Sequence, residues 1–407
     1  MKRNILLTFV LFSFIGLWTA SSIRAQDNIL GQQNVITTSV PFLIIGPDAR
    51  AGGMGEIGVA SSPDAYSQHW NAAKYMFVED DLGIGISYSP WLNKLVNDIS
   101  LMNLNIHYRF NERNAISGGL RFFTLGMITF TNKNGTNIGH AKPNEFSLFS
   151  SYIRKFSENI SGSIGFKFIR SDLTNGQNVG ESTTRAGYSV ASDVGFFYTK
   201  PLDISGLSSS HLDIGVNISN IGSKISYSDD DTKKNFIPTF LRIGHGLHMN
   251  IDEYNEFAFY SEIGKLLVPT PPLYAKDSTG QYIFDDNGME LIANGYSSDV
   301  SVATGMIQSF YDAPGGFREE LTEYIWSLGL EYTYNKQFSI RGGYFNEAKN
   351  KGNRKFFTLG VGLKYNVLGI DVSYLIPTVQ HHPLENTLRV SLSFNLADFS
   401  IGKEIKE

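Results

Sequence analysis

Histidine and serine are the side chains here best suited to chemistry, so their spacing is the first test for a catalytic or metal site. The 407 residues include eight histidines and no cysteine, which excludes thiolate nucleophiles, thiolate-bound metals and disulfides. His245 and His248 lie three residues apart, and on a strand this spacing places them on opposite faces, where they cannot share a metal ion. His381 and His382 fall in an expected outer loop, where solvated turn residues are common. The Gly-x-Ser-x-Gly nucleophile elbow of hydrolases does not occur.

Acidic and glycine-rich runs offer two further chemical possibilities, and neither has the required spacing. The acidic runs at residues 229–231 and 285–288 lack the ligand order of an EF-hand loop, so exposed acidic turns are expected instead. The Gly-Gly-Met-Gly run at residues 52–55 lacks the Lys-Ser/Thr ending of a phosphate-binding loop. The sequence therefore predicts no catalytic residue, no cofactor and no metal site, and we expect the protein not to be an enzyme.

The elements that position these residues are indicated by a period of two in hydrophobicity. Residues 324–334, 357–365 and 388–396 alternate apolar with polar or small side chains. Segments of this length and pattern are typical of barrel strands that face lipid on one side and the lumen on the other. Helical spans are excluded, because beyond the first 20 positions no run of about 18 apolar residues occurs.

Weaker segments of the same type bring the expected number of strands to about fourteen, an even number as in bacterial outer-membrane barrels. These segments begin near Leu82, Met102, Ile116, Phe146, Ile160, Val190, Leu212, Thr239, Phe257, Phe338 and Ile370. The connections alternate between long and short, which also favours a transmembrane barrel over a soluble β-sandwich. One connection on the expected short side, residues 201–210, is longer than this rule predicts.

Charged side chains of both signs fall on the register expected to face the lumen. They are His107, Arg109, Arg121, Lys167, Asp193, Asp213, Arg242, Glu262, Glu331, Arg341, Lys364, Asp371 and Arg389. Two interpretations remain: a water-filled pore, or a lumen crossed by ion pairs and filled by the N-terminal segment, which we favour.

The two ends of the chain indicate export and a separate internal segment. Lys2 and Arg3 precede an apolar stretch over residues 5–18, and small residues lead to Ala25, as in a secretory signal peptide. We therefore expect a signal peptide at 1–25, a hatch or plug at 26–81, the barrel at 82–396 and a periplasmic tail at 397–407. The net charge of −5 and the lack of a long basic run argue against a nucleic-acid partner.

The segment at 26–81 does not alternate and is rich in small residues. Its glycines permit close approach to other backbone, because they carry no side chain. The candidate hatch motif is Gly52, Gly53, Met54, Gly55, Trp70 and Asn71.

The connection at residues 265–321 is far longer than a simple loop and carries a helical pattern over residues 299–311. Pro314 and two following glycines end that pattern. The loop is either a cap over the barrel mouth or a docking surface for partner proteins. The candidate partner-binding residues are Val302, Met306, Ile307, Phe310, Tyr311 and Phe317.

The glycine run, with Asp64 and the Trp-Asn-Ala-Ala run at residues 70–73, resembles the N-terminal hatch pattern of FadL-type outer-membrane barrels, although Ala72 stands where that pattern has proline. Residues 40–50 and 382–389 are similar to the PorV branch, also called LptO. The resemblance covers nearly the whole mature chain. It implies a fourteen-stranded barrel, with both barrel ends periplasmic, in the type IX secretion system of Bacteroidota.

The same resemblance implies the partners and the role. Family members associate with the giant translocon barrel, receive the C-terminal signal domain of the cargo and carry it to the surface sortase complex. There the cargo is joined to lipopolysaccharide or released. The alternatives are a FadL-type channel for hydrophobic small molecules and, with no motif to support it, a lipopolysaccharide deacylase.

Overall fold

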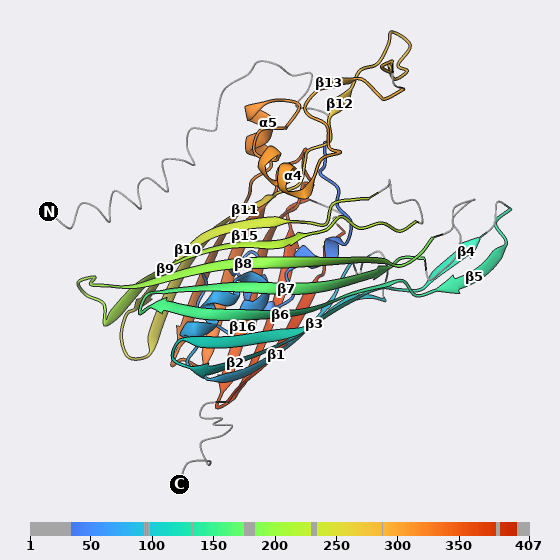
Figure 1. Ribbon diagram of the computed structural model, residues 1–407. Helices are drawn as coiled ribbons and strands as arrows, with labels where there is room; N and C mark the ends of the chain where they lie inside the picture. The colour runs from blue at the N-terminus through green and yellow to red at the C-terminus, as the bar shows by residue number, and fades with distance from the viewer. Residues whose placement is uncertain are drawn as a thin grey trace.

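The computed structural model is a closed barrel with part of the N-terminal segment inside it (Figure 1). It describes residues 34–92, 94, 96, 98–131, 134–174, 184–228, 234–286, 288–379 and 383–396. Fourteen antiparallel strands form the wall, and the barrel closes where the first strand pairs with the last. These strands are β1 Leu82–Pro90, β2 Ile99–Asn111, β3 Asn114–Leu125, β6 Asn144–Ser157, β7 Ile160–Asp172, β8 Gly187–Leu202, β9 Ser209–Gly222, β10 Phe240–Asn250, β11 Asn255–Leu266, β14 Ile325–Tyr334, β15 Phe338–Asn346, β16 Lys355–Tyr365, β17 Leu368–Pro377 and β18 Leu388–Leu396.

The remaining elements lie inside the barrel or in its loops. Inside are the short helices η1 Pro41–Ile44, α2 Ala49–Gly52, α3 Ser67–Trp70 and η2 Ala72–Phe77. The loops carry two hairpins and two helices: β4 Ile128–Thr131 with β5 Asn137–Ala141, β12 Leu273–Tyr274 with β13 Ile292–Asn294, α4 Val302–Gln308 and α5 Phe317–Thr322. Among the described residues, none of the helices is long and apolar enough to cross a membrane.

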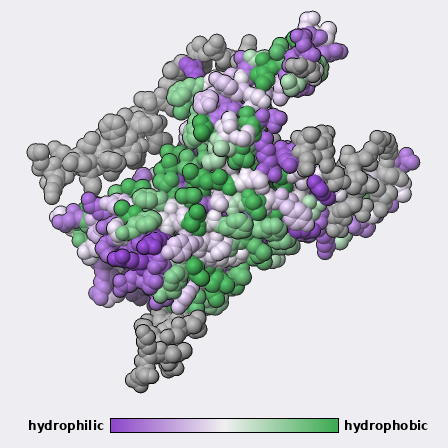
Figure 2. Space-filling model, in the orientation of Figure 1, coloured by the Kyte–Doolittle hydropathy of each residue, from purple (hydrophilic) through white to green (hydrophobic). Residues whose placement is uncertain are grey.

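Every segment predicted from the period of two is a strand of the wall, and the predicted alternation of faces is confirmed. In β16, Phe357, Leu359 and Val361 are exposed on the outside, while Gly360 and Gly362 face inward and are buried. On the face seen in Figure 2, hydrophobic residues form a band across the barrel wall, and hydrophilic residues gather at the end where the short turns lie. This band is the surface that contacts lipid.

The alternation of long and short connections also holds, with one correction. The connection between β8 and β9 is residues 203–208, shorter than expected, because β8 continues to Leu202 and β9 starts at Ser209. The longest connection runs from residue 267 to 324, between β11 and β14. In outer-membrane barrels short turns are periplasmic, so this loop is extracellular. The expected signal peptide and the expected tail at 397–407 lie outside the described residues.

The inward face carries the charges predicted for it, and they form ion pairs. Apart from Arg109 and Lys364, the side chains of that set are all buried. Lys167 pairs with Asp193 at 2.8 Å, and Arg242 pairs with Glu262 at 3.2 Å. The favoured interpretation, a lumen crossed by ion pairs, describes the structure better than an open pore.

Candidate functional site

The glycine run of the hatch lies directly against the backbone of the barrel wall. A Cβ on Gly53 would be 2.9 Å from the Cα of Gly360 in β16. Gly55 has a φ of +74°, and a Cβ there would be 2.8 Å from the Tyr344 carbonyl oxygen in β15. Met54 between them is fully buried and packs with Ile57 and with the β11 residues Ala258 and Tyr260. Side chains larger than hydrogen at the two glycines would push the hatch off the wall.

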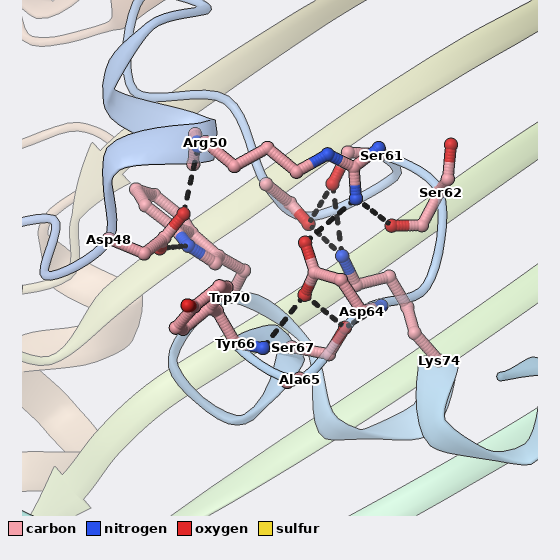
Figure 3. Close-up of polar contacts among 12 residues, drawn as sticks. Asp48, Arg50, Ser61, Ser62, Asp64, Ala65, Tyr66, Ser67, Trp70 and Lys74 are labelled. Carbon is pink, nitrogen blue, oxygen red and sulfur yellow. Dashed lines mark hydrogen bonds and ion pairs between the residues drawn. The ribbon is translucent and has the colours of Figure 1, made fainter. Parts of the chain in front are cut away.

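An arginine of α2 connects the hatch to the wall electrostatically. Arg50 donates to Asp64 at 2.8 Å within the hatch, as Figure 3 shows. It also makes a bidentate contact with Glu331 of β14, at 3.0 and 3.1 Å. Arg341 of β15 pairs with the same Glu331 at 2.7 Å and with Asp371 of β17 at 2.6 Å. This alternating chain of charges joins the hatch to three wall strands, and bidentate pairs of this kind fix geometry as well as charge.

Trp70 and Asn71, the second half of the predicted hatch motif, are both buried and hydrogen-bonded. The Trp70 indole N–H donates to Asp48 Oδ1 at 2.7 Å, while the other oxygen of Asp48 caps α2 by accepting from Ala51. Burial raises the pKa of Asp48 to about 6. The Asn71 side-chain amide donates to the Phe196 carbonyl in β8 at 2.9 Å. These bonds hold the hatch turn in one position in the lumen.

Lys74 is a buried charge of the hatch that the sequence did not single out. Its Nζ donates to the Gly58 carbonyl at 2.7 Å and to Ser61 Oγ at 3.0 Å. Burial is the largest influence on this group and lowers the pKa of Lys74 to about 8. The side chain lies near Asp64 in Figure 3. A lysine at a single sequence position gives no periodic signal, so its role emerges only from the folded hatch.

The extracellular half of the lumen is closed by apolar side chains around η1. Phe42 stacks on Phe123 of β3 with ring centroids 6.2 Å apart. Val40, Phe42 and Leu43 are buried in a cluster with residues of the wall and the outer loops. The other buried members are Trp91, Ile99, Leu101, Phe123, Ile169, Ala191, Ile225, Ile237, Phe345, Phe356, Leu375 and Leu384.

The opposite end of the lumen contains a polar cavity of about 470 Å³. Its lining includes Arg50 and Asp64 of the hatch, His248 of the wall, and residues of the short turns such as Lys336. The cavity is therefore on the periplasmic side, beneath the hatch.

The long extracellular loop forms a cap with a buried, charged base. Lys265 at the end of β11 is within 2.7 Å of both Glu320 and Glu323. Lys351, from the loop between β15 and β16, pairs with Glu319 at 2.6 Å and with Glu323 at 2.9 Å. Two lysines from different parts of the chain thus hold α5 in place, and all five side chains are buried.

The predicted partner-binding residues divide between the surface and the interior of this cap. Ile307, Phe310, Tyr311 and Phe317 are exposed, with Phe317 at 76%. Val302 and Met306, which belong to α4 itself, are half-buried. Tyr311 meets Tyr296 edge-on, with ring centroids 5.7 Å apart. The cap therefore presents apolar and aromatic side chains to the outside on a fixed base.

Two clusters in the described part of the chain have donor groups that suit a metal ion. One is Asp312, Glu320 and Glu323 beneath the cap, where the ammonium of Lys265 already occupies the space between the two glutamates. The other is His211, Asp213 and His248 at the periplasmic cavity. Sequence reasoning missed both, because their members come from different elements.

A closed fourteen-stranded barrel, apolar toward lipid and filled by its own N-terminal segment, is an integral protein of the bacterial outer membrane. The chain belongs to the PorV family: the model described as "Type IX secretion system protein PorV" matches residues 28–273. It is thus an outer-membrane component of the type IX secretion system.

Comparison with curated proteins finds no match. Among solved structures, the toluene transporter TbuX of Ralstonia pickettii is 10% identical with a TM-score of 0.45, and the match covers 87% of this chain and 98% of that one. A FadL homologue of Pseudomonas aeruginosa is 12% identical with a TM-score of 0.44, covering 89% and 99%.

Proposed function

We propose that this protein binds the C-terminal signal domain of secreted cargo at the giant translocon barrel and delivers it to the surface sortase complex, without catalysis of its own. Membership of the PorV family supports a role in type IX secretion. The observation that carries the finer proposal is the cap, whose exposed Ile307, Phe310, Tyr311 and Phe317 face outward on a buried base. Exposed apolar groups of this kind mark sites of protein contact.

The base of the cap explains how such a surface remains available for a partner. Loop side chains that are free to reorient lose conformational entropy on binding, whereas a surface held in advance loses less. Here the ion pairs of Lys265 and Lys351 hold α5, the helix that begins at Phe317, in place. Tyr and Phe on such a surface supply a large contact area with few rotatable bonds.

The alternative, a channel for hydrophobic small molecules, requires an apolar pocket behind the hatch. The large cavity beneath the hatch is lined instead by charged and polar groups such as Arg50, Asp64 and Glu331. Two other cavities, against Arg121 and against Arg242, measure about 10 and 30 Å³, close to the size of one or two water molecules. These features give the channel hypothesis no support.

The test replaces two exposed aromatics of the cap, Tyr311→Ser with Phe317→Ser, in a strain that exports a signal-domain cargo. We expect normal barrel insertion, seen as heat-modifiable migration in gels. Cargo on the surface should fall at least tenfold, because truncating hot-spot aromatics costs about 2 kcal/mol or more. The variant should also retain less translocon barrel or cargo when purified in detergent.

The matched control is Tyr282→Ser with Phe284→Ser, two exposed aromatics that lie between β12 and β13 in the same loop. This control should display cargo normally. Normal display in the Tyr311 and Phe317 variant would refute the role of the cap. Uptake of hydrophobic compounds by liposomes containing the wild-type barrel would favour the channel instead.

A further inference from the structure

Two histidines and an aspartate meet on the inner face of neighbouring strands, at the periplasmic opening of the lumen. His211 of β9 lies directly opposite His248 of β10 in the strand register. Their rings stack with centroids 4.2 Å apart and planes 6° from parallel. Asp213 lies two residues along β9 on the same face, and one of its oxygens, Oδ2, is 3.1 Å from His248 Nε2 and 3.6 Å from His211 Nε2.

These separations are those of ligands around a single metal ion. Nitrogen and oxygen ligands at about 2.0–2.2 Å from zinc, in tetrahedral geometry, are about 3.3–3.5 Å from one another. The distances from the Asp213 oxygen to the two histidine nitrogens lie on either side of this range. All three donor atoms already lie within 4.8 Å of one another. On binding, the imidazoles would turn out of their stacked arrangement, so that the in-plane lone pair of each Nε2 points at the ion.

The polar atoms at this point are not satisfied by the surrounding protein. Within the described residues, Asp213 Oδ1 is buried and has no hydrogen-bond partner. His248 Nε2 is buried too, and although it lies 3.1 Å from Asp213 Oδ2, it forms no hydrogen bond there. Asp213 is 1% exposed and His248 is 7% exposed, so bulk water does not compensate either group. Leaving a buried donor or acceptor unpaired is costly, and such atoms therefore point to a bound species. An ion held by Asp213 Oδ2 and the two histidine Nε2 atoms would give His248 Nε2 the partner that it lacks.

The second nitrogen of His248 has the partner that a ligating histidine needs. Its Nδ1 is 3.5 Å from Ser62 Oγ in the hatch, and Ser62 Oγ is 3.2 Å from the Tyr260 hydroxyl. When Nε2 gives its lone pair to a metal, Nδ1 carries the proton and donates to Ser62. Ligating histidines almost always have such an outer partner, which fixes the tautomer and the ring orientation.

We propose that His211, Asp213 and His248 form a binding site for one divalent transition-metal ion of the zinc class. Both histidines line the periplasmic cavity, so a fourth position is open to water or to another ligand. The donor set of two imidazoles and one carboxylate favours such an ion over calcium or magnesium, which bind oxygen ligands. A bound ion links β9 to β10 and, through His248 and Ser62, to the hatch.

The experiment is a calorimetric titration of the full mature chain in detergent with zinc chloride. Any affinity tag is removed, and His381 and His382 are both replaced by alanine so that this adjacent pair does not bind zinc. We expect one equivalent of zinc per chain. Cobalt(II) should give the visible absorption of a four- or five-coordinate site under the same conditions.

The variants His211→Ala, Asp213→Asn and His248→Ala should each weaken binding at least tenfold. The matched control is His245→Ala, which removes a histidine from the same strand β10 but from the lipid-facing side. It should bind zinc as the parent does. Heat-modifiable migration of each variant shows that the barrel is folded.

Absence of zinc binding by the folded parent would overturn the proposal. So would equal affinity in the parent and the His211 and His248 variants, which would mean adventitious zinc only. Zinc should also raise the temperature at which the parent barrel unfolds, and magnesium should not. These results are independent of cargo transport, so their failure leaves the proposed function untouched.

Discussion

Two adjacent glycines of β15 provide a sharp test of how the hatch is held. Gly343 faces the lumen, and a Cβ there would be 2.7 Å from the Met54 carbonyl oxygen, and nearer still to the carbonyl carbon and the Gly55 nitrogen. Gly342 faces lipid, and a Cβ there would meet nothing within 4 Å. The variants Gly343→Ala and Gly342→Ala therefore add the same methyl group to the same strand on opposite faces.

The expected magnitude follows from the geometry. Ordinary van der Waals contact begins at 3.4 Å. The Met54 oxygen alone therefore requires the hatch or the strand to move by 0.7 Å, and the nearer Met54 carbonyl carbon and Gly55 nitrogen require a larger movement. The obstructing atoms are backbone, which cannot rotate away, and overpacking of this kind costs about 1–3 kcal/mol. The alanine at 342 should be neutral or stabilising by up to about 1 kcal/mol, because glycine in a strand is unfavourable.

The assay combines unfolding with a reporter in the hatch. The chain has no cysteine, so Ser61→Cys introduces a single thiol at a side chain that is 2% exposed. We expect Gly343→Ala to lower the temperature at which heat-modifiable migration is lost by a few degrees and to accelerate maleimide labelling of the thiol. Gly342→Ala should change neither. Equal unfolding temperatures and labelling rates in the two variants would refute the account of the hatch contact.

Three further predictions concern the buried charges. Replacing Arg50 with Met leaves Asp64 and Glu331 without this partner, so the free energy of unfolding should fall by about 3 kcal/mol or more. The measurement is the temperature at which heat-modifiable migration is lost, compared with that of an arginine variant in an exposed turn. Lys265→Met should leave the barrel folded but make α5 accessible to protease, because the buried Glu320 and Glu323 lose a cation. A rate of proteolysis at α5 equal to that of the wild type would contradict this. Burial raises the pKa of Asp312, in the cap, from 3.8 to about 6, so between these values the folded cap holds a proton that the unfolded loop has released. The cap should therefore lose stability as pH rises from about 4 to about 6, and Asp312→Asn should flatten this slope in hydrogen-exchange protection.

The wall of the barrel was predictable because its pattern is local. In β18, Leu388 faces lipid and Arg389 is buried in the lumen, as the alternation indicates. The close packing of Gly53 and Gly55 was also predictable, since only glycine permits backbone to approach backbone at this distance. The helix over residues 302–308 agrees with its predicted spacing.

The rest depends on contacts that adjacent residues do not encode. Helix α5 has six residues and draws its stability from Lys265 and Lys351, which come from other parts of the chain, so no local pattern predicts it. The facing of His211 and His248 depends on the register between β9 and β10. His245, the histidine nearest to His248 in the sequence, lies on the opposite face of β10, so spacing along one strand does not reveal the pair.

The arrangement along the lumen limits where the proposed contact with cargo could take place. Apolar packing around Phe42 closes the extracellular half, the ion pairs of Arg50 and Glu331 cross the middle, and the polar cavity occupies only the periplasmic end. A path for a folded domain through this barrel would require breaking a buried charge network and removing the hatch, each at a cost of several kcal/mol. The exposed aromatics of the cap require no such rearrangement. The packing of this barrel is therefore consistent with the proposal that cargo is bound at the outer surface and not inside the lumen.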